Sequence, residues 1–69
     1  MYQYIDGNCA LSINDWIAAG LTYNQFKNDS KRGFLQIAQR GINGETLIWV
    51  DSIRRADRLR DIELAYGKA

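Results

Sequence analysis

The first eleven residues carry the alternation that is typical of short β-strands. Apolar and polar side chains alternate in Tyr-Gln-Tyr-Ile at positions 2–5, which predicts a strand. Asp6 and Gly7 follow, and this dipeptide favours a type I′ turn. Residues 9–11, Cys-Ala-Leu, are therefore expected to return along the first strand as the second half of a hairpin.

Helical spacing begins directly after this hairpin. Ile13, Trp16 and Ile17 recur at positions i, i+3 and i+4, which predicts a helix over about residues 13–19 with these side chains on one face. Ser12 precedes them and is a residue type that commonly caps a helix N-terminus.

A three-residue corner separates this helix from a second one. Gly20 can take a positive φ and so end the first helix. Leu21 is apolar in the middle of the turn, so we expect it in the core. Thr22 is a suitable N-cap for a second helix over about residues 23–31, which Gly33 closes.

The second helix is polar for its length. Only Tyr23 and Phe26 give it apolar surface, and an isolated nine-residue helix of this composition would be unstable in water. It therefore depends on packing of these two aromatic side chains against the first helix. The polar side chains left outward or at its edge are Gln25, Lys27, Asn28, Lys31 and Arg32.

The second half of the chain predicts another hairpin. Residues 34–40 and 46–50 are rich in β-forming residues. Between them, Asn43 followed by Gly44 is a hairpin turn signal.

A last helix is expected over residues 53–66, with Asp51 or Ser52 as its cap. Its apolar stripe consists of Ile53, Ala56, Leu59, Ile62 and Tyr66. Opposite charges at i, i+3 spacing predict three surface ion pairs, Arg54 with Asp57, Arg58 with Asp61, and Arg60 with Glu63.

Together these elements predict one α+β domain over residues 1–69 in the order β-β-α-α-β-β-α. Alternation along the two later strands is expected to turn one set of their side chains towards the helices. The predicted core comprises Ile13, Trp16, Ile17, Leu21, Phe26, Leu35, Ile37, Leu47, Trp49, Ile53, Leu59 and Ile62.

Composition fits a small globular domain. The chain has 69 residues, of which 46% are hydrophobic and 12% aromatic, so a small core is feasible. No apolar run approaches the roughly 20 residues of a membrane span, and the N-terminus lacks the pattern of a signal peptide. We therefore expect no membrane association and a cytoplasmic location. Cys9 is the single cysteine and histidine is absent, so neither an internal disulfide, a metal site nor a cofactor is expected.

Charge is unevenly distributed although the net charge is only +1. Residues 1–21 sum to −2, whereas residues 22–60 carry eight basic and four acidic side chains. The basic excess begins at the corner between the two helices. It points to a polyanionic partner, with an ordinary solvated surface as the alternative.

Two helices joined by a short Gly-containing turn and followed by a hairpin form a helix-turn-helix with a wing. Such a motif presents its second helix to the major groove of DNA, where Asn and Gln can bind adenine and Lys and Arg can bind guanine or phosphate. The alternative is that a short surface helix is polar only because it is exposed. The candidate DNA-binding residues are Tyr23, Asn24, Gln25, Lys27, Asn28 and Lys31 in the helix at about 23–31, facing the major groove of double-stranded DNA, and Arg32, Arg40 and Asn43 near the wing at about 34–50, reaching the DNA backbone.

Residues 11–41, LSINDWIAAGLTYNQFKNDSKRGFLQIAQRG, resemble the N-terminal winged-helix domain of phage-Mu-like DDE transposases and, more distantly, MerR- and excisionase-type DNA-binding domains. Arg32 and Gly33 match an Arg-Gly pair that follows the second helix in this wider group. Residues 46–67, TLIWVDSIRRADRLRDIELAYG, are similar to the transposase pattern of a strand leading into a helix that ends in Tyr-Gly. Trp16 departs from the simpler repressors, which usually have a small residue in the first helix, so the helix crossing is expected to differ.

The resemblance implies a DNA-binding module. Such a module either stands alone or begins a longer recombination protein, whose catalytic carboxylates would lie further along the polypeptide. Catalysis by this chain itself is not expected, because histidine is absent and Cys9 has no evident activating partner. The competing interpretation is a winged-helix protein-interaction module without DNA binding, since a net charge of +1 is low for a strong DNA binder and a fold does not determine function.

Overall fold

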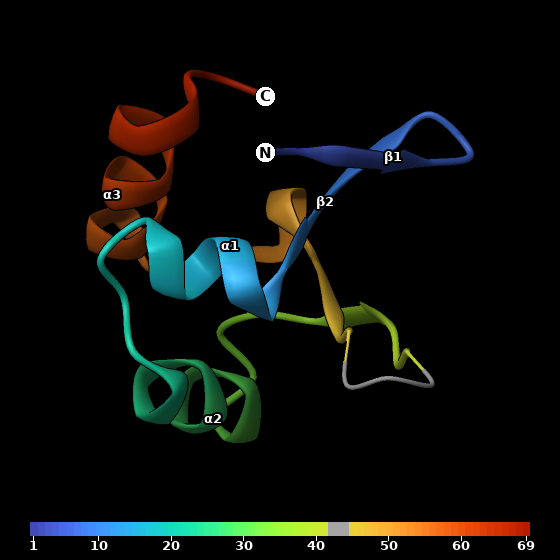
Figure 1. Ribbon diagram of the computed structural model, residues 1–69. Coiled ribbons are helices and arrows are strands. Elements are labelled where there is room, and N and C mark those ends of the chain that lie inside the picture. The colour runs from blue at the N-terminus through green and yellow to red at the C-terminus, as the bar shows by residue number, and fades with distance from the viewer. Residues whose placement is uncertain (42–44) are drawn as a thin grey trace.

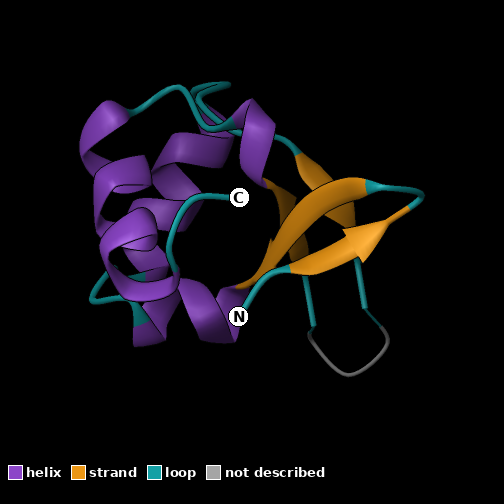
Figure 2. Cartoon of the chain, turned by 90° about the horizontal axis from the view of Figure 1, so that it is seen from above, coloured by secondary structure: helices purple, strands orange, loops and turns teal. Residues whose placement is uncertain are grey.

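A four-stranded antiparallel sheet and three helices make up this α+β chain (Figures 1 and 2). The computed structural model describes residues 1–41 and 45–69. Along the chain the elements are β1 (Gln3–Ile5), β2 (Asn8–Ser12), α1 (Ile13–Ala18), α2 (Tyr23–Lys31), β3 (Ile37–Gln39), β4 (Leu47–Trp49), the 3₁₀ helix η1 (Val50–Ser52) and α3 (Ala56–Tyr66).

The first hairpin forms where the alternation predicted it. β1 and β2 are antiparallel, with Tyr4 opposite Cys9. Asp6 and Gly7 between them have φ values of +51° and +83°, and both positive values are what a type I′ turn requires. This turn therefore sets the register between β1 and β2.

The sheet has the strand order β1-β2-β4-β3, so β4 lies in its interior and pairs with both β2 and β3. The second hairpin is thus joined to the first one through β2. The helices gather on one side of this sheet in both views (Figures 1 and 2). The two hairpins therefore form one continuous sheet, and the main core lies between this sheet and the helices.

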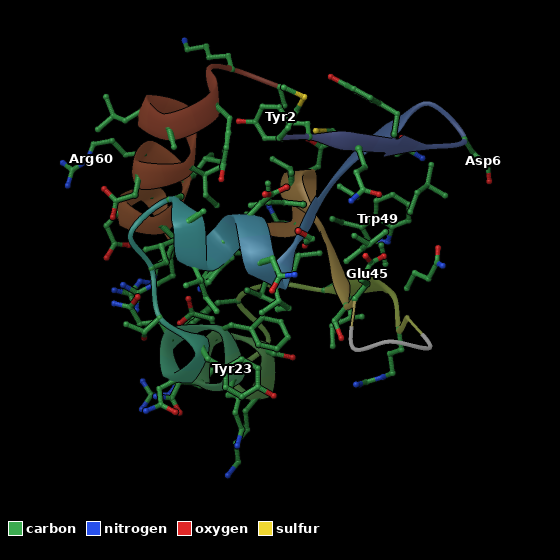
Figure 3. All side chains as sticks on the ribbon, viewed as in Figure 1. Tyr2, Asp6, Tyr23, Glu45, Trp49 and Arg60 are labelled. Carbon is green, nitrogen blue, oxygen red and sulfur yellow. The ribbon has the colours of Figure 1, made fainter. Side chains whose placement is uncertain are left out.

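The prediction that Leu47 and Trp49 face the helices was wrong, because Ile48, which alternates with both, takes that face. Ile48 lies opposite Leu11 in the sheet, and both are fully buried in the main core. Leu47 is buried outside that core cluster, and Trp49, which lies opposite Ala10, is only half-buried. Figure 3 shows Trp49 on the side of the sheet away from the helices. Every residue of β4 is apolar, so alternation could not decide between the two faces, and pairing with β2 decided it.

α1 is short and turns into the corner as expected. The Ser12 hydroxyl accepts the amide of Asp15 at 3.1 Å and so caps the helix. Gly20 has a φ of +97°, which places it in the region that favours glycine. Ile17 was predicted in the core but is 47% exposed. Trp16 is 0% exposed and marks the buried face of the helix. Ile17 is the next residue, about 100° further round the helix axis, so its side chain points away from that face.

The indole of Trp16 fixes the corner from inside. Its Nε1–H donates to the backbone oxygen of Thr22 at 2.8 Å. Its ring meets Phe26 edge-on, with centroids 6.4 Å apart and an interplanar angle of 74°. The large residue in α1 therefore holds both the turn and α2 in place.

α3 begins later than predicted, and neither Asp51 nor Ser52 caps it. Ser52 instead accepts the amide of Gln36 at 2.8 Å through its hydroxyl. The amide of Arg54 donates to the carbonyl oxygen of Phe34 at 2.7 Å. These bonds hold the chain before α3 against the segment that follows α2. The backbone is extended at Ile53 and Arg55, with ψ values of 117° and 109°, so the helix begins only at Ala56.

The main core is built from both hairpins and all three helices. Cys9, Leu11, Ile48 and Val50 belong to it although they were not predicted. Its buried members are Cys9, Leu11, Ile13, Trp16, Leu21, Phe26, Leu35, Ile48, Val50, Ile53 and Ile62, with Tyr2, Ala19, Ile37, Leu59 and Tyr66 packed against them. Within the described ranges, no helix has the length and apolar character needed to cross a lipid bilayer.

Candidate nucleic-acid interface

The polar side chains of α2 lie on its outward face. Asn24, Lys27, Asn28 and Lys31 are all exposed, and their i, i+3, i+4, i+7 spacing places them on one stripe of the helix. Thr22 caps this helix as predicted, by accepting the amide of Gln25 at 3.1 Å. The sequence therefore forms the expected helix and presents four of the candidate residues together.

An open groove of about 480 Å³ runs between α2 and the β3–β4 hairpin. It is lined by Tyr23, Phe26, Lys27, Asn28, Ser30, Lys31, Ile37, Arg40 and Thr46. The basic residues that line it come from two parts of the chain, Lys27 and Lys31 from α2 and Arg40 from the position directly after β3. No acidic side chain lines the groove within the part of the chain that the structure describes. The groove therefore concentrates positive charge in a way that suits an anionic ligand.

Tyr23 adds an aromatic surface to this groove. Its side chain lies at the N-terminal end of α2 and is 52% exposed (Figure 3). The ammonium group of Lys27 lies 5.8 Å from the centre of the Tyr23 ring, within the range of a cation–π contact. The Tyr23 ring also lies near that of Phe26, with centroids 5.8 Å apart. These contacts hold Tyr23 at the rim without burying it.

Gln25 and Arg32 do not line the groove, and Asn43 falls outside the described residues. Gln25 has a structural role, because its side-chain oxygen accepts the amide of Thr22 at 2.8 Å and completes the capping box. Arg32 is exposed at the C-cap of α2 but does not line the groove. Asn43 and the predicted Asn43-Gly44 turn lie outside the described residues.

The inner face of α2 is anchored by one apolar and one charged residue. Phe26 and Asp29 are its two buried side chains. Asp29 is 2% exposed, and its Oδ2 accepts the Nε–H of Arg58 at 3.0 Å, while Nη1 of Arg55 lies 3.8 Å from Oδ1. This carboxylate therefore joins α2 to the start of α3.

The three ion pairs predicted along the last helix are not formed. Arg55 pairs with Asp57 at 2.8 Å, and Arg58 pairs with Asp29 and Asp57. Arg54 precedes the helix, which begins at Ala56, and Arg58 turns to the buried Asp29 of α2, which spacing along one helix could not identify. Arg60 points away from the other elements (Figure 3).

Pairing between Arg55 and Asp57 at the start of α3 shifts the pKa of both groups. The pKa of Asp57 is lowered chiefly by its hydrogen bond from Arg55. The same bond raises the pKa of Arg55. Both groups are therefore charged throughout the neutral range.

Two further features concern the Cys9 thiol and the grouping of side chains that bind metals. Burial raises the pKa of the Cys9 thiol, so it is protonated and poorly nucleophilic at neutral pH. No three His, Cys, Asp or Glu side chains of residues 1–41 and 45–69 come together as a metal site would need.

The sequence interpretation missed Asp29 as well as three groove residues, Ser30, Ile37 and Thr46. Asp29 follows Phe26 by three positions and is the single acid of a basic helix, so its spacing did indicate an inward position. The sequence did not indicate that Ile37 and Thr46 line the groove, because these residues belong to the hairpin and its position beside α2 depends on the tertiary structure.

Comparison of the chain with protein-family models, with curated proteins and with solved structures gives no match.

Proposed function

We propose that this domain binds double-stranded DNA through α2 and the flank of the β3–β4 hairpin. The observation that carries the proposal is the groove in which Lys27, Lys31 and Arg40 converge without an acidic neighbour among the described residues. Two elements contribute to it, so a phosphate backbone could be held from both sides. The outward stripe of α2 then faces base edges, because the major groove is wide enough to admit a helix.

The candidate residues divide into two roles. Lys27, Lys31 and Arg40 contact phosphates, since these basic residues line the groove. Asn24 and Asn28 project from the outward stripe and can make paired hydrogen bonds to adenine. The finer proposal, a winged helix that targets a recombination protein to DNA, rests on the resemblance of residues 11–67 to transposase domains.

Matched substitutions test this proposal. We expect random duplex to bind in the usual non-specific range of about 10⁻⁴–10⁻⁶ M at physiological salt and more tightly at low salt, because affinity falls steeply as salt rises. Arg40→Ala should weaken binding to all duplexes and reduce the salt slope by about one unit. Arg60→Ala removes the same charge from the outer side of α3 and should leave both quantities nearly unchanged (Figure 3).

A second pair of variants uses lysine. Lys31→Ala should behave as Arg40→Ala does, whereas Lys68→Ala, at the exposed C-terminal end of the chain, serves as its control. Equal effects in each pair would show that net charge alone drives binding and would overturn the assignment of the groove. Absence of binding at low salt would refute DNA binding altogether.

The second candidate function is a protein-interaction module. It is favoured by the net charge of +1 and by exposed apolar side chains such as Ile17 and Leu64. Binding through these side chains would depend weakly on salt, in contrast to phosphate binding. Ile17→Ser and Leu64→Ser should leave duplex binding intact if DNA is the partner.

A further inference from the structure

A buried carboxylate occupies an unusual place on the proposed DNA-binding helix. α2 carries Lys27 and Lys31 outward but turns Asp29 inward, where its side chain is 3% exposed. The negative charge is therefore kept away from the face that would meet a polyanion. It is compensated by Arg58 and Arg55, which belong to α3 and its N-cap.

The two ends of α2 are held by different means. Its N-terminal half is fixed by the Trp16 bond to Thr22 and by the Phe26 ring packed on Trp16. In its C-terminal half, Asp29 is the single buried side chain. Asp29 lies about 4.5 Å further along the helix axis than Phe26, so together they are two points that define the direction of α2.

α3 is a firm reference for this second point. Ile62 is 0% exposed in the core, and the hydroxyl of Tyr66 donates to the backbone oxygen of Asp15 at 2.9 Å. α3 is thus fixed to the core and to α1 independently of α2. An ion pair from α3 to Asp29 therefore fixes how α2 lies against the rest of the domain.

We infer that Asp29, held by Arg58 and Arg55, is a positioning residue that sets the orientation of α2 for DNA. This inference rests on the proposed function. A buried ion pair is a poor source of net stability, because desolvation offsets much of the attraction, but it is directional and can select one geometry. The Nε–H of Arg58 at 3.0 Å supplies that direction. Without it, α2 can pivot about Phe26 and carry Lys27 and Lys31 away from Arg40.

Asp29→Asn and Asp57→Asn form a matched pair for the test. Each removes one carboxylate that pairs with Arg55 and Arg58, and each raises the net charge by one. Simple electrostatics predicts that both variants bind DNA more tightly. Asp57 does not belong to α2, so the positioning role predicts opposite results for the two variants.

The first measurement is duplex affinity by fluorescence anisotropy, at a temperature where circular dichroism shows the variants folded. Asp29→Asn should bind about tenfold more weakly, because the correctly oriented helix falls to about a tenth of the population. Asp57→Asn should bind at least as tightly as the unmodified protein. Tighter binding by both variants would overturn the inference.

The second measurement needs no DNA and separates this inference from the proposed function. Residual dipolar couplings of the amides in α2 report its orientation in the free protein. We expect them to change in Asp29→Asn while those of the sheet and α1 persist, and to stay unchanged in Asp57→Asn. Unchanged α2 couplings in Asp29→Asn would refute the positioning role, even if the protein binds DNA.

A milder variant covers the case in which Asp29→Asn does not fold. Arg58→Lys keeps the positive charge but removes the Nε–H that donates to Asp29. The α2 couplings should shift in this variant as well, and their persistence would contradict the inference. If the unmodified protein binds no duplex while the couplings shift as expected, the proposed function fails and the positioning of α2 by Asp29 stands.

Discussion

Replacing Trp16 with Phe tests how the corner between α1 and α2 is held. Phe keeps an aromatic ring that can pack on Phe26, but it cannot donate a hydrogen bond to the carbonyl oxygen of Thr22. It also leaves a gap where the larger indole was, in a site that is 0% exposed. The substitution therefore separates the hydrogen bond and the lost volume from general aromatic packing.

The expected cost follows from two terms. Loss of the bond at 2.8 Å removes about 1 kcal/mol, and the amide of Phe26 still donates to the same oxygen at 3.2 Å, so that oxygen is not left without a partner. Removing part of a buried ring costs about 1–2 kcal/mol more, well below the full truncation to Ala. The sum is about 2–3 kcal/mol, which corresponds to a fall of roughly 10–20 °C in Tm for a domain of this size.

Urea and thermal unfolding followed by far-ultraviolet circular dichroism measure this change. Trp49→Phe is the matched control, because Trp49 is half-buried and its indole N–H forms no hydrogen bond with residues 1–41 or 45–69. It should cost less than about 1 kcal/mol. If the two variants lose equal stability, or if Trp16→Phe lies within about 0.5 kcal/mol of the unmodified protein, the stated role of Trp16 is wrong.

Three further perturbations probe other parts of the fold. Gly20→Val should lower the free energy of unfolding by more than about 1 kcal/mol through backbone strain, because φ at Gly20 is +97°. A steric clash does not contribute, since a Cβ there meets no atom within 4 Å, and an unchanged urea midpoint would contradict this prediction. Cys9 should react with a thiol reagent at a rate set by unfolding, since the buried thiol has a raised pKa, and fast labelling in native buffer would refute its burial. Asp57, whose pKa is lowered by Arg55, binds protons less readily in the folded state, so its contribution to stability is present above its ordinary value of 3.8 and disappears as the pH falls. Asp57→Asn should therefore reduce the loss of stability between neutral pH and about pH 3, and an identical loss would show that the pair is not formed in solution.

The candidate interface was predictable in part. The polar stripe of α2 followed from spacing, because a helix places i, i+3, i+4 and i+7 on one face whatever surrounds it. Arg40 was named from the sequence, but its convergence with Lys27 and Lys31 depends on where the hairpin lies beside α2. Gln25 was predicted to face DNA, and its side-chain oxygen accepts the amide of Thr22 in the capping box. This local hydrogen bond was also predictable from the sequence, because Thr22 lies three positions before Gln25.

The elements whose formation depends on neighbours in the chain were determined by the sequence itself. The type I′ turn at Asp6 and Gly7, the caps at Ser12 and Thr22, and the positive φ at Gly20 each involve interactions within a few residues. Such interactions act on the backbone directly, so residue type and spacing are enough to predict them.

Interactions between distant segments were decided only by the tertiary structure. In β4 every position is apolar, so pairing with β2 selected Ile48 for the core and left Trp49 on the other face. The segment before α3 is hydrogen-bonded to the segment after α2 and is extended at Ile53 and Arg55, so α3 begins only at Ala56. Asp29 pairs with arginines 26 and 29 residues further along the chain and with no residue of its own helix. A buried carboxylate needs a compensating cation, and the packing of α3 against α2 determines which cations are close enough.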